Sequence, residues 1–238
     1  MKLALLLCGH PQEKFYPITG GDYDIYFQNY FDQFSDHDVS LKCFDVTAGC
    51  YPQNRGDFDG YITTGSKYSV YDELDWIKEL AVFFQSLYHD GEKLVGVCFG
   101  HQMMAHALGG VVERSQNGWG VGVKSFDVFD IAKHEQWFKP ALNSFNIFMS
   151  CQDQVQVVPA ESTVLAGSDF CPIGMYRVGA NMLGFQGHPE FTAAYSEALM
   201  ADRVDRIPAE VIAAARATLS IQPHKRELAS WIVNFIRS

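Results

Sequence analysis

The stretch Gly96-Val-Cys-Phe-Gly-His-Gln102 is the segment that most constrains how this chain can fold. Apolar Leu94-Val95 precedes it and the apolar run Met103–Leu108 follows it, an order that predicts a buried strand, a sharp turn and a helix. Flanking glycines suit such a turn because only glycine tolerates its strained backbone and the close approach of neighbouring chain. The positive end of the helix would favour a thiolate at Cys98. The segment therefore predicts an exposed cysteine nucleophile, although a buried structural cysteine remains the alternative for this motif alone.

A second motif, Gly184-Phe-Gln-Gly-His-Pro-Glu190, supplies the groups that a cysteine nucleophile needs. Its apolar start predicts a short strand, which Pro189 should end because proline cannot donate a ladder hydrogen bond. A cysteine nucleophile requires an imidazole that takes its proton, and the imidazole requires a carboxylate that fixes its orientation. We therefore predict that Cys98, His188 and Glu190 form a catalytic triad. A surface histidine and a charge near a helix start are the alternatives for His188 and Glu190 taken singly.

Taken together, Gly-x-Cys-x-Gly-His-Gln followed by Gly-His-Pro-Glu resembles the class I (triad) glutamine amidotransferase domain, from Leu3 to about Tyr195. The resemblance implies an α/β domain in which Cys98 attacks a γ-glutamyl amide. A thioester would form, ammonia or an amine would leave, and water would complete the hydrolysis. The expected substrate is thus a small molecule, glutamine or a γ-glutamyl compound.

The resemblance also implies an oxyanion hole made of backbone N–H groups. One donor would be Phe99, the residue after the nucleophile, and the other would come from the loop that contains Gly65 and Ser66, with Ser66 N–H as the expected donor. The family usually has Gly-Gly-Pro where this chain has Gly65-Ser66-Lys67. A backbone donor survives the change to serine, but the proline that would stiffen the loop is missing.

Four residues are expected to hold the substrate by the same resemblance. Gln102 matches a glutamine-contacting residue of the family, and Ser150, Gln152 and Asp153 lie in a segment that holds the α-amino and α-carboxylate groups. Many family members have Ser-His-Gly-Asp there, whereas this chain has Cys151 and Gln152 at the two middle positions. The rim of the glutamyl pocket is therefore expected to differ.

The chain also resembles GMP-synthase-like amidotransferase domains, and shorter matches point to a stand-alone branch that includes the γ-glutamyl peptidases. They are Tyr16-x-x-x-Gly-Gly-Asp22, Asp75-Trp-Ile77 and Gln152-Asp-x-Val155. The peptidases of this branch cut γ-glutamyl bonds in glutathione-type conjugates, so a free-standing hydrolase is the favoured hypothesis. Two alternatives stay open: a glutaminase subunit that supplies ammonia to a separate synthase, and a non-catalytic binding or regulatory protein on the same fold.

Composition excludes several other classes. The net charge is −10 with no basic run, which argues against a nucleic-acid partner. The six cysteines lack metal-binding spacing, so we expect neither a metal nor another cofactor. The apolar start of the chain is too short for a signal peptide, and no stretch is long enough to cross a membrane, which predicts a cytoplasmic protein without a membrane partner.

Strand and helix signals alternate in the first half, which predicts an α/β fold with a mostly parallel central sheet in a flavodoxin-like three-layer arrangement. From Val111 to His188 the signals are mostly strands, expected as hairpins appended to that sheet. Residues 193–238 are expected to form helices packed on the core, so that residues 1–238 make one domain. The glycine-rich segment around Trp119 is either part of a substrate cleft or a plain hairpin turn.

Overall fold

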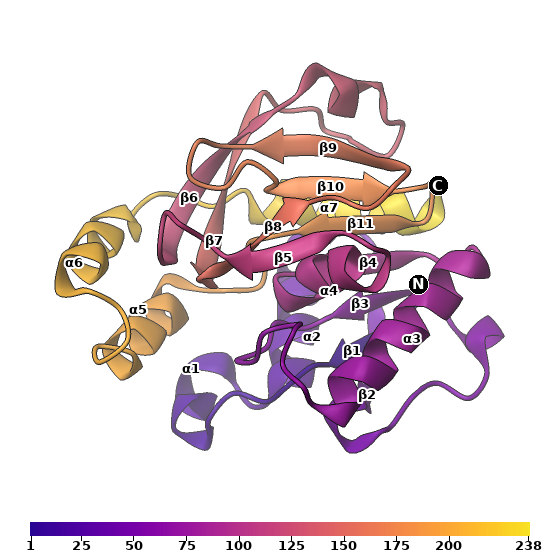
Figure 1. The fold of residues 1–238 in the computed structure, drawn as a ribbon, viewed down its shortest axis with the longest axis horizontal. Helices are drawn as coiled ribbons and strands as arrows, with labels where there is room; N and C mark the ends of the chain where they lie inside the picture. The colour runs from indigo at the N-terminus through magenta and orange to yellow at the C-terminus, as the bar shows by residue number, and fades with distance from the viewer.

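The computed structural model describes residues 1–238, and its centre is a nine-stranded sheet with the strand order β2-β1-β3-β4-β11-β10-β9-β6-β7 (Figure 1). Neighbours among the first five strands pair in parallel, and the remaining pairs are antiparallel. The parallel strands are β2 (Ser40–Asp45), β1 (Lys2–Leu7), β3 (Gly60–Thr63), β4 (Leu94–Val97) and β11 (Met182–Phe185). The antiparallel strands are β10 (Met175–Val178), β9 (Ser162–Gly167), β6 (Gly120–Val128) and β7 (Ser144–Cys151). The predicted α/β fold is confirmed, and its sheet is mixed because the hairpins extend it.

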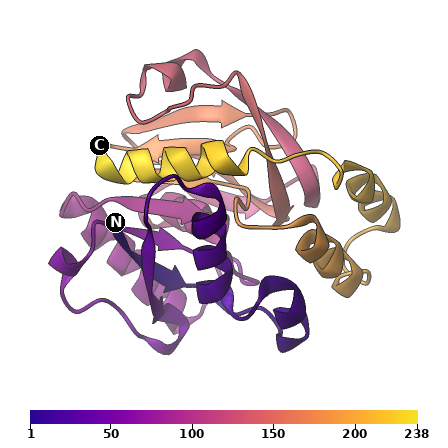
Figure 2. The same ribbon diagram turned by 180° about the vertical axis from the view of Figure 1, so that it is seen from behind.

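Helices cover both faces of the parallel half. Helices α3 (Asp75–His89) and α4 (Phe99–Ala107) pack on one face, whereas α2 (Tyr23–Phe34) and α7 (Lys225–Arg237) lie side by side on the other (Figures 1 and 2). The short helix α1 (Tyr16–Thr19) precedes α2, and α5 (Ala193–Asp202) and α6 (Ala209–Thr218) pack beside β6. No helix has the length and apolar character needed to cross a membrane.

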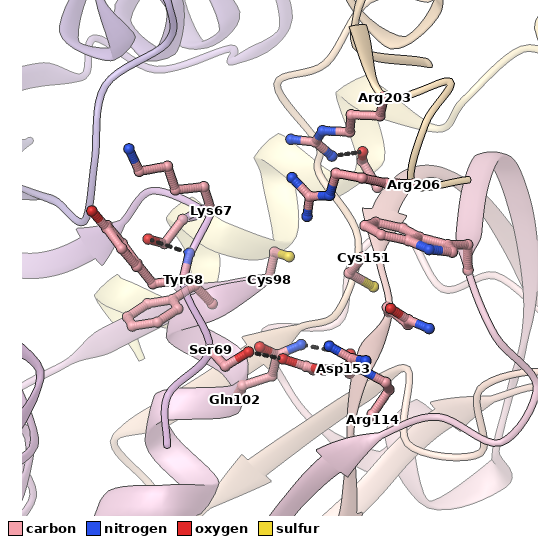
Figure 3. Close-up of a pocket in the computed structure, with 15 residues that line it drawn as sticks. Lys67, Tyr68, Ser69, Cys98, Gln102, Arg114, Cys151, Asp153, Arg203 and Arg206 are labelled. Atoms are coloured by element: carbon pink, nitrogen blue, oxygen red, sulfur yellow. Dashed lines mark hydrogen bonds between the residues drawn. The ribbon is translucent and has the colours of Figure 1, made fainter. Parts of the chain in front are cut away.

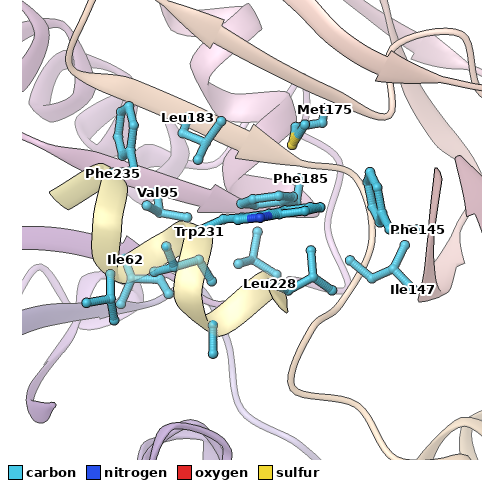
Figure 4. Close-up of a cluster of buried hydrophobic side chains, with 14 of the residues drawn as sticks. Ile62, Val95, Phe145, Ile147, Met175, Leu183, Phe185, Leu228, Trp231 and Phe235 are labelled. Atoms are coloured by element: carbon cyan, nitrogen blue, oxygen red, sulfur yellow. The ribbon is translucent and has the colours of Figure 1, made fainter. Parts of the chain in front are cut away.

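The C-terminal helix α7 closes the core on its side of the sheet. Its apolar residues recur at Leu228, Trp231, Ile232 and Phe235, a spacing that places them on one helix face, and all are buried. Trp231 lies at the centre of this cluster (Figure 4). Its ring packs against Phe138 at 4.2 Å between centroids with a tilt of 34°, and its indole N–H donates to Pro140 O. Burying each large side chain contributes about 1.5–3 kcal/mol, so this face anchors the sheet.

Two short strands were not predicted from the sequence. Strands β5 (Val111–Arg114) and β8 (Asp153–Val157) pair antiparallel in a separate two-stranded sheet, in which Arg114 is the register partner of Asp153. Each is short: half of the four residues in β5 are polar without alternation, and the polar–apolar alternation in β8 covers only Gln154–Val157. This pair is important because it places an arginine beside the segment that the sequence predicts to hold the substrate.

The parallel strands all end at one edge of the sheet, and the loops that follow them meet there. This edge is where open α/β sheets bind ligands. The loop after β3 carries Gly65 and Ser66, Cys98 follows β4, and His188 and Glu190 follow β11. The sheet order β3-β4-β11 therefore brings the three segments together.

Candidate active site

Cys98 occupies a strained turn between β4 and α4. Its φ of 51° and ψ of −94° lie in a region that residues other than glycine rarely adopt. The backbone is held on both sides, because Cys98 N–H donates to Phe185 O at 2.8 Å and Cys98 O accepts from Gln102 N–H at 3.0 Å. The strain is therefore fixed by the neighbouring strand and by the first turn of the helix.

The two glycines of the elbow are required by close packing rather than by their own dihedral angles. A methyl group on Gly96 would lie 2.6 Å from the carbonyl carbon of Gly100, and one on Gly100 would lie 1.9 Å from Thr63 Oγ1. Thr63 Oγ1 in turn accepts a hydrogen bond from Val97 N–H at 3.1 Å. The Gly-x-Cys-x-Gly pattern thus lets the start of α4 press against strand β3.

The imidazole of His188 is held on three sides. Its Nδ1 lies 2.8 Å from Glu190 Oε1, and both side chains are buried. Phe191 stacks on the ring at 3.8 Å between centroids and 16° between planes, and a methyl group on Gly65 would come within 2.6 Å of His188 Cε1. The ring therefore has almost no rotational freedom, and it lies close enough to Cys98 for each group to shift the pKa of the other.

The thiol of Cys98 is strongly acidic despite its burial. The Cys151 thiol, which hydrogen-bonds Cys98, lowers the pKa of Cys98 to about 5, with the charge and hydrogen bond of His188 outweighing the opposing effect of burial. Burial lowers the pKa of His188, but the charges of Glu190 and Cys98 raise it to about 10. Between these values the pair is a thiolate and an imidazolium, the form that is ready to attack and to protonate a leaving group.

Cys151 and Gln186 complete the surroundings of the nucleophile. The amide nitrogen of Gln186 lies 3.8 Å from Cys98 Sγ and 3.5 Å from Cys151 Sγ, so it donates to both sulfurs. The pKa of Cys151 is raised well above its usual range, first by its hydrogen bond to Cys98 and then by burial. Cys151 therefore stays a neutral donor. The sequence pattern marked Cys151 only as a change in the pocket rim and gave no sign that it touches the nucleophile.

His101, three residues after Cys98, does not serve as its base. It is fully buried, and its ring packs edge-on against Tyr176 at 4.8 Å. Burial lowers the pKa of His101 to about 3, so the ring remains neutral. Each of the two sequence motifs contains one histidine, and of these two only His188 faces the thiol of Cys98.

The predicted oxyanion-hole residues lie beside Cys98. Phe99 begins α4, and the first N–H groups of a helix have no acceptor within the helix. Phe99 and Ser66 line the same cavity as Cys98, and Gly65 packs against the imidazole of His188. The structure thus brings these backbone groups to the nucleophile, and their part in catalysis stays a prediction.

The predicted substrate-binding residues also meet in this cavity (Figure 3). Gln102, Ser150, Gln152 and Asp153 all line it together with Cys98. Gln102 Nε2 donates to Asp153 O at 2.7 Å, and the carboxylate of Asp153 accepts from Ser69 Oγ and from the hydroxyl of Tyr71 at 3.0 Å. This carboxylate is held by two neutral donors and takes part in no ion pair, and it lies at the wall of the cavity.

Three arginines in the cavity wall were missed by the sequence analysis, namely Arg114, Arg203 and Arg206. Arg203 and Arg206 lie in the turn after α5, and Arg114 ends β5. No local motif marks them, because each reaches the cavity only through tertiary packing. Trp119, which the sequence left open as cleft or turn, lines the cavity and lies under the guanidinium of Arg206 at 5.5 Å.

Comparisons with known proteins show which family this chain resembles. The family model described as glutamine amidotransferase class-I matches residues 22–205. Gamma-glutamyl peptidase 3 of Arabidopsis thaliana is 31% identical over 87% of this chain and 82% of its own length. A putative glutamine amidotransferase of Saccharomyces cerevisiae is 31% identical over 73% of this chain and 70% of its own length. A GMP synthase of Albidiferax ferrireducens is 31% identical over 62% of this chain, but only over 28% of its own length.

Solved structures support the fold. The crystal structure of a glutamine amidotransferase from Thermotoga maritima superposes with a TM-score of 0.72, at 19% identity, over 99% of this chain and 98% of that one. The resemblance seen in the sequence, including the branch with γ-glutamyl peptidases, is confirmed by these matches. This chain belongs to the class I glutamine amidotransferase family.

Proposed function

We propose that this protein is a stand-alone cysteine hydrolase that cleaves the γ-amide or γ-peptide bond of glutamine or γ-glutamyl substrates through a thioester on Cys98. The observation that carries the proposal is the position of Cys98 on the strained turn before α4, in one buried site with His188, whose Nδ1 lies 2.8 Å from Glu190 Oε1. The lowered pKa of Cys98 and the raised pKa of His188 support a thiolate–imidazolium pair. A thiolate beside an imidazolium is the activated form of a cysteine nucleophile.

In the first half of the reaction, Cys98 Sγ attacks the γ-carbonyl carbon of the substrate. The negative charge that develops on the carbonyl oxygen is stabilised by the backbone N–H groups of Phe99 and Ser66, worth about 2.7–4 kcal/mol for one such donor. His188 then gives its proton to the departing nitrogen. Ammonia or an amine leaves, and a γ-glutamyl thioester remains on Cys98.

In the second half, neutral His188 takes a proton from a water molecule, which attacks the thioester carbon. The tetrahedral intermediate collapses, the carbon–sulfur bond breaks, and glutamate leaves while Cys98 returns to the thiolate and His188 to the imidazolium. Glu190 keeps the ring oriented and stabilises its positive form throughout, as an orienting carboxylate does in related triads.

The glutamyl head group fits the end of the cavity that Gln102, Arg114 and Asp153 form. Asp153 offers an unpaired carboxylate for the α-ammonium group, and Arg114, its cross-strand partner, offers a guanidinium for the α-carboxylate. This arrangement supports recognition of an α-amino acid. The similarity to γ-glutamyl peptidases over 87% of the chain favours a peptide substrate over an ammonia-supplying role.

The test is a comparison of kcat/KM for glutamine, γ-glutamyl dipeptides and glutathione conjugates, with wild-type protein and with the Cys98→Ala variant. We expect hydrolysis by the wild type, with peptides preferred, and none by the variant. Turnover that survives in Cys98→Ala would refute the mechanism. A strong preference for glutamine, raised further by a co-purifying synthase, would instead support the ammonia-supplying alternative.

A further inference from the structure

The cavity at Cys98 carries a positive charge that contrasts with the rest of the molecule. The chain has a net charge of −10, yet Lys67, Arg114, Arg203 and Arg206 all line this cavity, with Asp153 as the acidic side chain among the lining residues. None of these four cations takes part in an ion pair with a carboxylate. Unpaired guanidinium groups gathered in a cavity indicate an anionic ligand.

These cations lie at two opposite ends of the cavity (Figure 3). Arg114 lies beside Asp153 and Gln102 at one end, whereas Arg203 and Arg206 lie at the other, with Cys98 between them. The head group of a γ-glutamyl substrate has one carboxylate and one ammonium, which Arg114 and Asp153 satisfy. A substrate with a neutral leaving group, such as glutamine, therefore has no anionic group that Arg203 and Arg206 could bind.

Arg203 is the better placed of the two for binding. It is partly buried, and its side chain has one hydrogen bond, from Nη1 to Ser150 Oγ at 2.7 Å, which leaves most of its donors free. Arg206 is exposed and lies over the ring of Trp119. The bond to a neutral hydroxyl orients Arg203 without cancelling its charge.

Arg203 also lines a second hollow, on the His188 side of the nucleophile. This hollow has a volume of about 580 Å³, against about 90 Å³ for the cavity at Cys98, and Ser66, Lys67 and Ser150 belong to both. His188 protonates the departing nitrogen, so the leaving group must lie on this side. The larger space and the free guanidinium therefore meet where the leaving group would be.

From this arrangement we infer that the preferred substrates have a leaving group with its own carboxylate, and that Arg203, assisted by Arg206, binds that carboxylate. This inference rests on the proposed function and adds to it the residue that recognises the C-terminal carboxylate of a departing amino acid or short peptide. Arg203 is thus a specificity-determining residue that separates γ-glutamyl peptides from glutamine.

The experiment compares substrates that differ only in this charge. The kcat/KM values are measured for γ-glutamyl-glycine and γ-glutamyl-glycyl-glycine, each as the free acid and as the C-terminal amide, with glutamine alongside. We expect the acid to be preferred at one or both lengths by about tenfold to hundredfold, the usual effect of a hydrogen bond to a charged group. Raising the salt concentration should reduce this preference.

Substitutions test whether Arg203 is responsible for the preference for the free acid over the amide. In Arg203→Met the acid-to-amide ratio should fall close to one, in Arg206→Met it should fall by less, and in Arg203→Lys it should be intermediate because the charge remains without the bidentate fork. The matched control is Arg216→Met, since Arg216 pairs with Glu197 on the exposed helix α6 and should leave the ratio unchanged.

The outcomes separate the inference from the proposed function. Hydrolysis of acids and amides with equal kcat/KM by the wild type overturns the inference alone, as does a ratio that Arg203→Met leaves intact. Absence of turnover on every substrate, glutamine included, overturns the proposed function and the inference with it. The wild-type comparison needs no substitution, so a variant that fails to fold does not remove the test.

Discussion

Cys8 and Cys98 are both buried thiols at the carboxyl ends of parallel strands, β1 and β4, which only β3 separates. They differ completely in acidity. Burial raises the pKa of Cys8 far above its usual range, whereas the pKa of Cys98 is lowered to about 5. Position at the end of a strand is therefore not what activates a thiol in this fold.

The difference lies in what surrounds each sulfur. Cys8 Sγ donates to Leu6 O at 3.7 Å, and a loop that starts at Gly9 follows it in place of a helix. Cys98 caps α4 and has the Cys151 thiol and the imidazolium of His188 beside it. Opposite charge and hydrogen-bond donors overcome the cost of burial at one site only.

The largest expected effect separates the two cysteines by function. Cys98→Ala should lower kcat by about 10⁴-fold or more, as loss of a nucleophile does in other triad enzymes, whereas Cys8→Ala should leave kcat near its wild-type value. Steady-state kinetics on a γ-glutamyl peptide measures both. If kcat fell by a comparable factor in both variants, and circular dichroism showed both proteins to be folded, the assignment of Cys98 alone as the nucleophile would be contradicted.

The next prediction concerns Gly65, which packs against the imidazole of His188 but is not itself a triad residue. In Gly65→Ala the new methyl would lie 2.6 Å from His188 Cε1, so the ring must shift from its present position beside Cys98. A displacement of about 1 Å can cost about 10²-fold in kcat. The matched control is Gly56→Ala, where the nearest atom would be 3.6 Å away, and it should retain full activity. Equal activities of the two variants would show that Gly65 does not hold the ring.

A smaller, pH-dependent effect tests the part played by Cys151. Cys151→Ala removes the group that lowers the pKa of Cys98 most, so that pKa should rise. A nucleophile with a raised pKa is protonated over a wider acid range, and kcat/KM should fall about tenfold at pH 6 but little at pH 9. Cys151→Ser keeps a donor and should lie between the two. A loss of the same size at every pH would argue for a packing defect instead.

The fold class could be predicted from the sequence, and the triad residues could be proposed from it, because both depend on local patterns. Gly96 and Gly100 are required because a side chain at either position would clash within the turn or with the neighbouring strand. In Gly-His-Pro-Glu, the proline itself marks the end of the preceding strand. The contact of Cys151 with Cys98 and the approach of Arg203 could not be predicted. These contacts join residues that are far apart in the chain, through the pairing of β6 with β7 and through the turn after α5. No pattern in the local sequence indicates them.

The central claim is that Cys98 is a thiolate at neutral pH while Cys8 is not. Alkylation by iodoacetamide, followed for each cysteine peptide by mass spectrometry between pH 4 and pH 10, tests it directly, because only the thiolate reacts. Reaction at Cys98 should be half-maximal near pH 5 and reach a plateau by neutral pH, with Cys8 unreactive throughout. Half-maximal reaction of Cys98 near its ordinary value of about 8.5 would contradict the account.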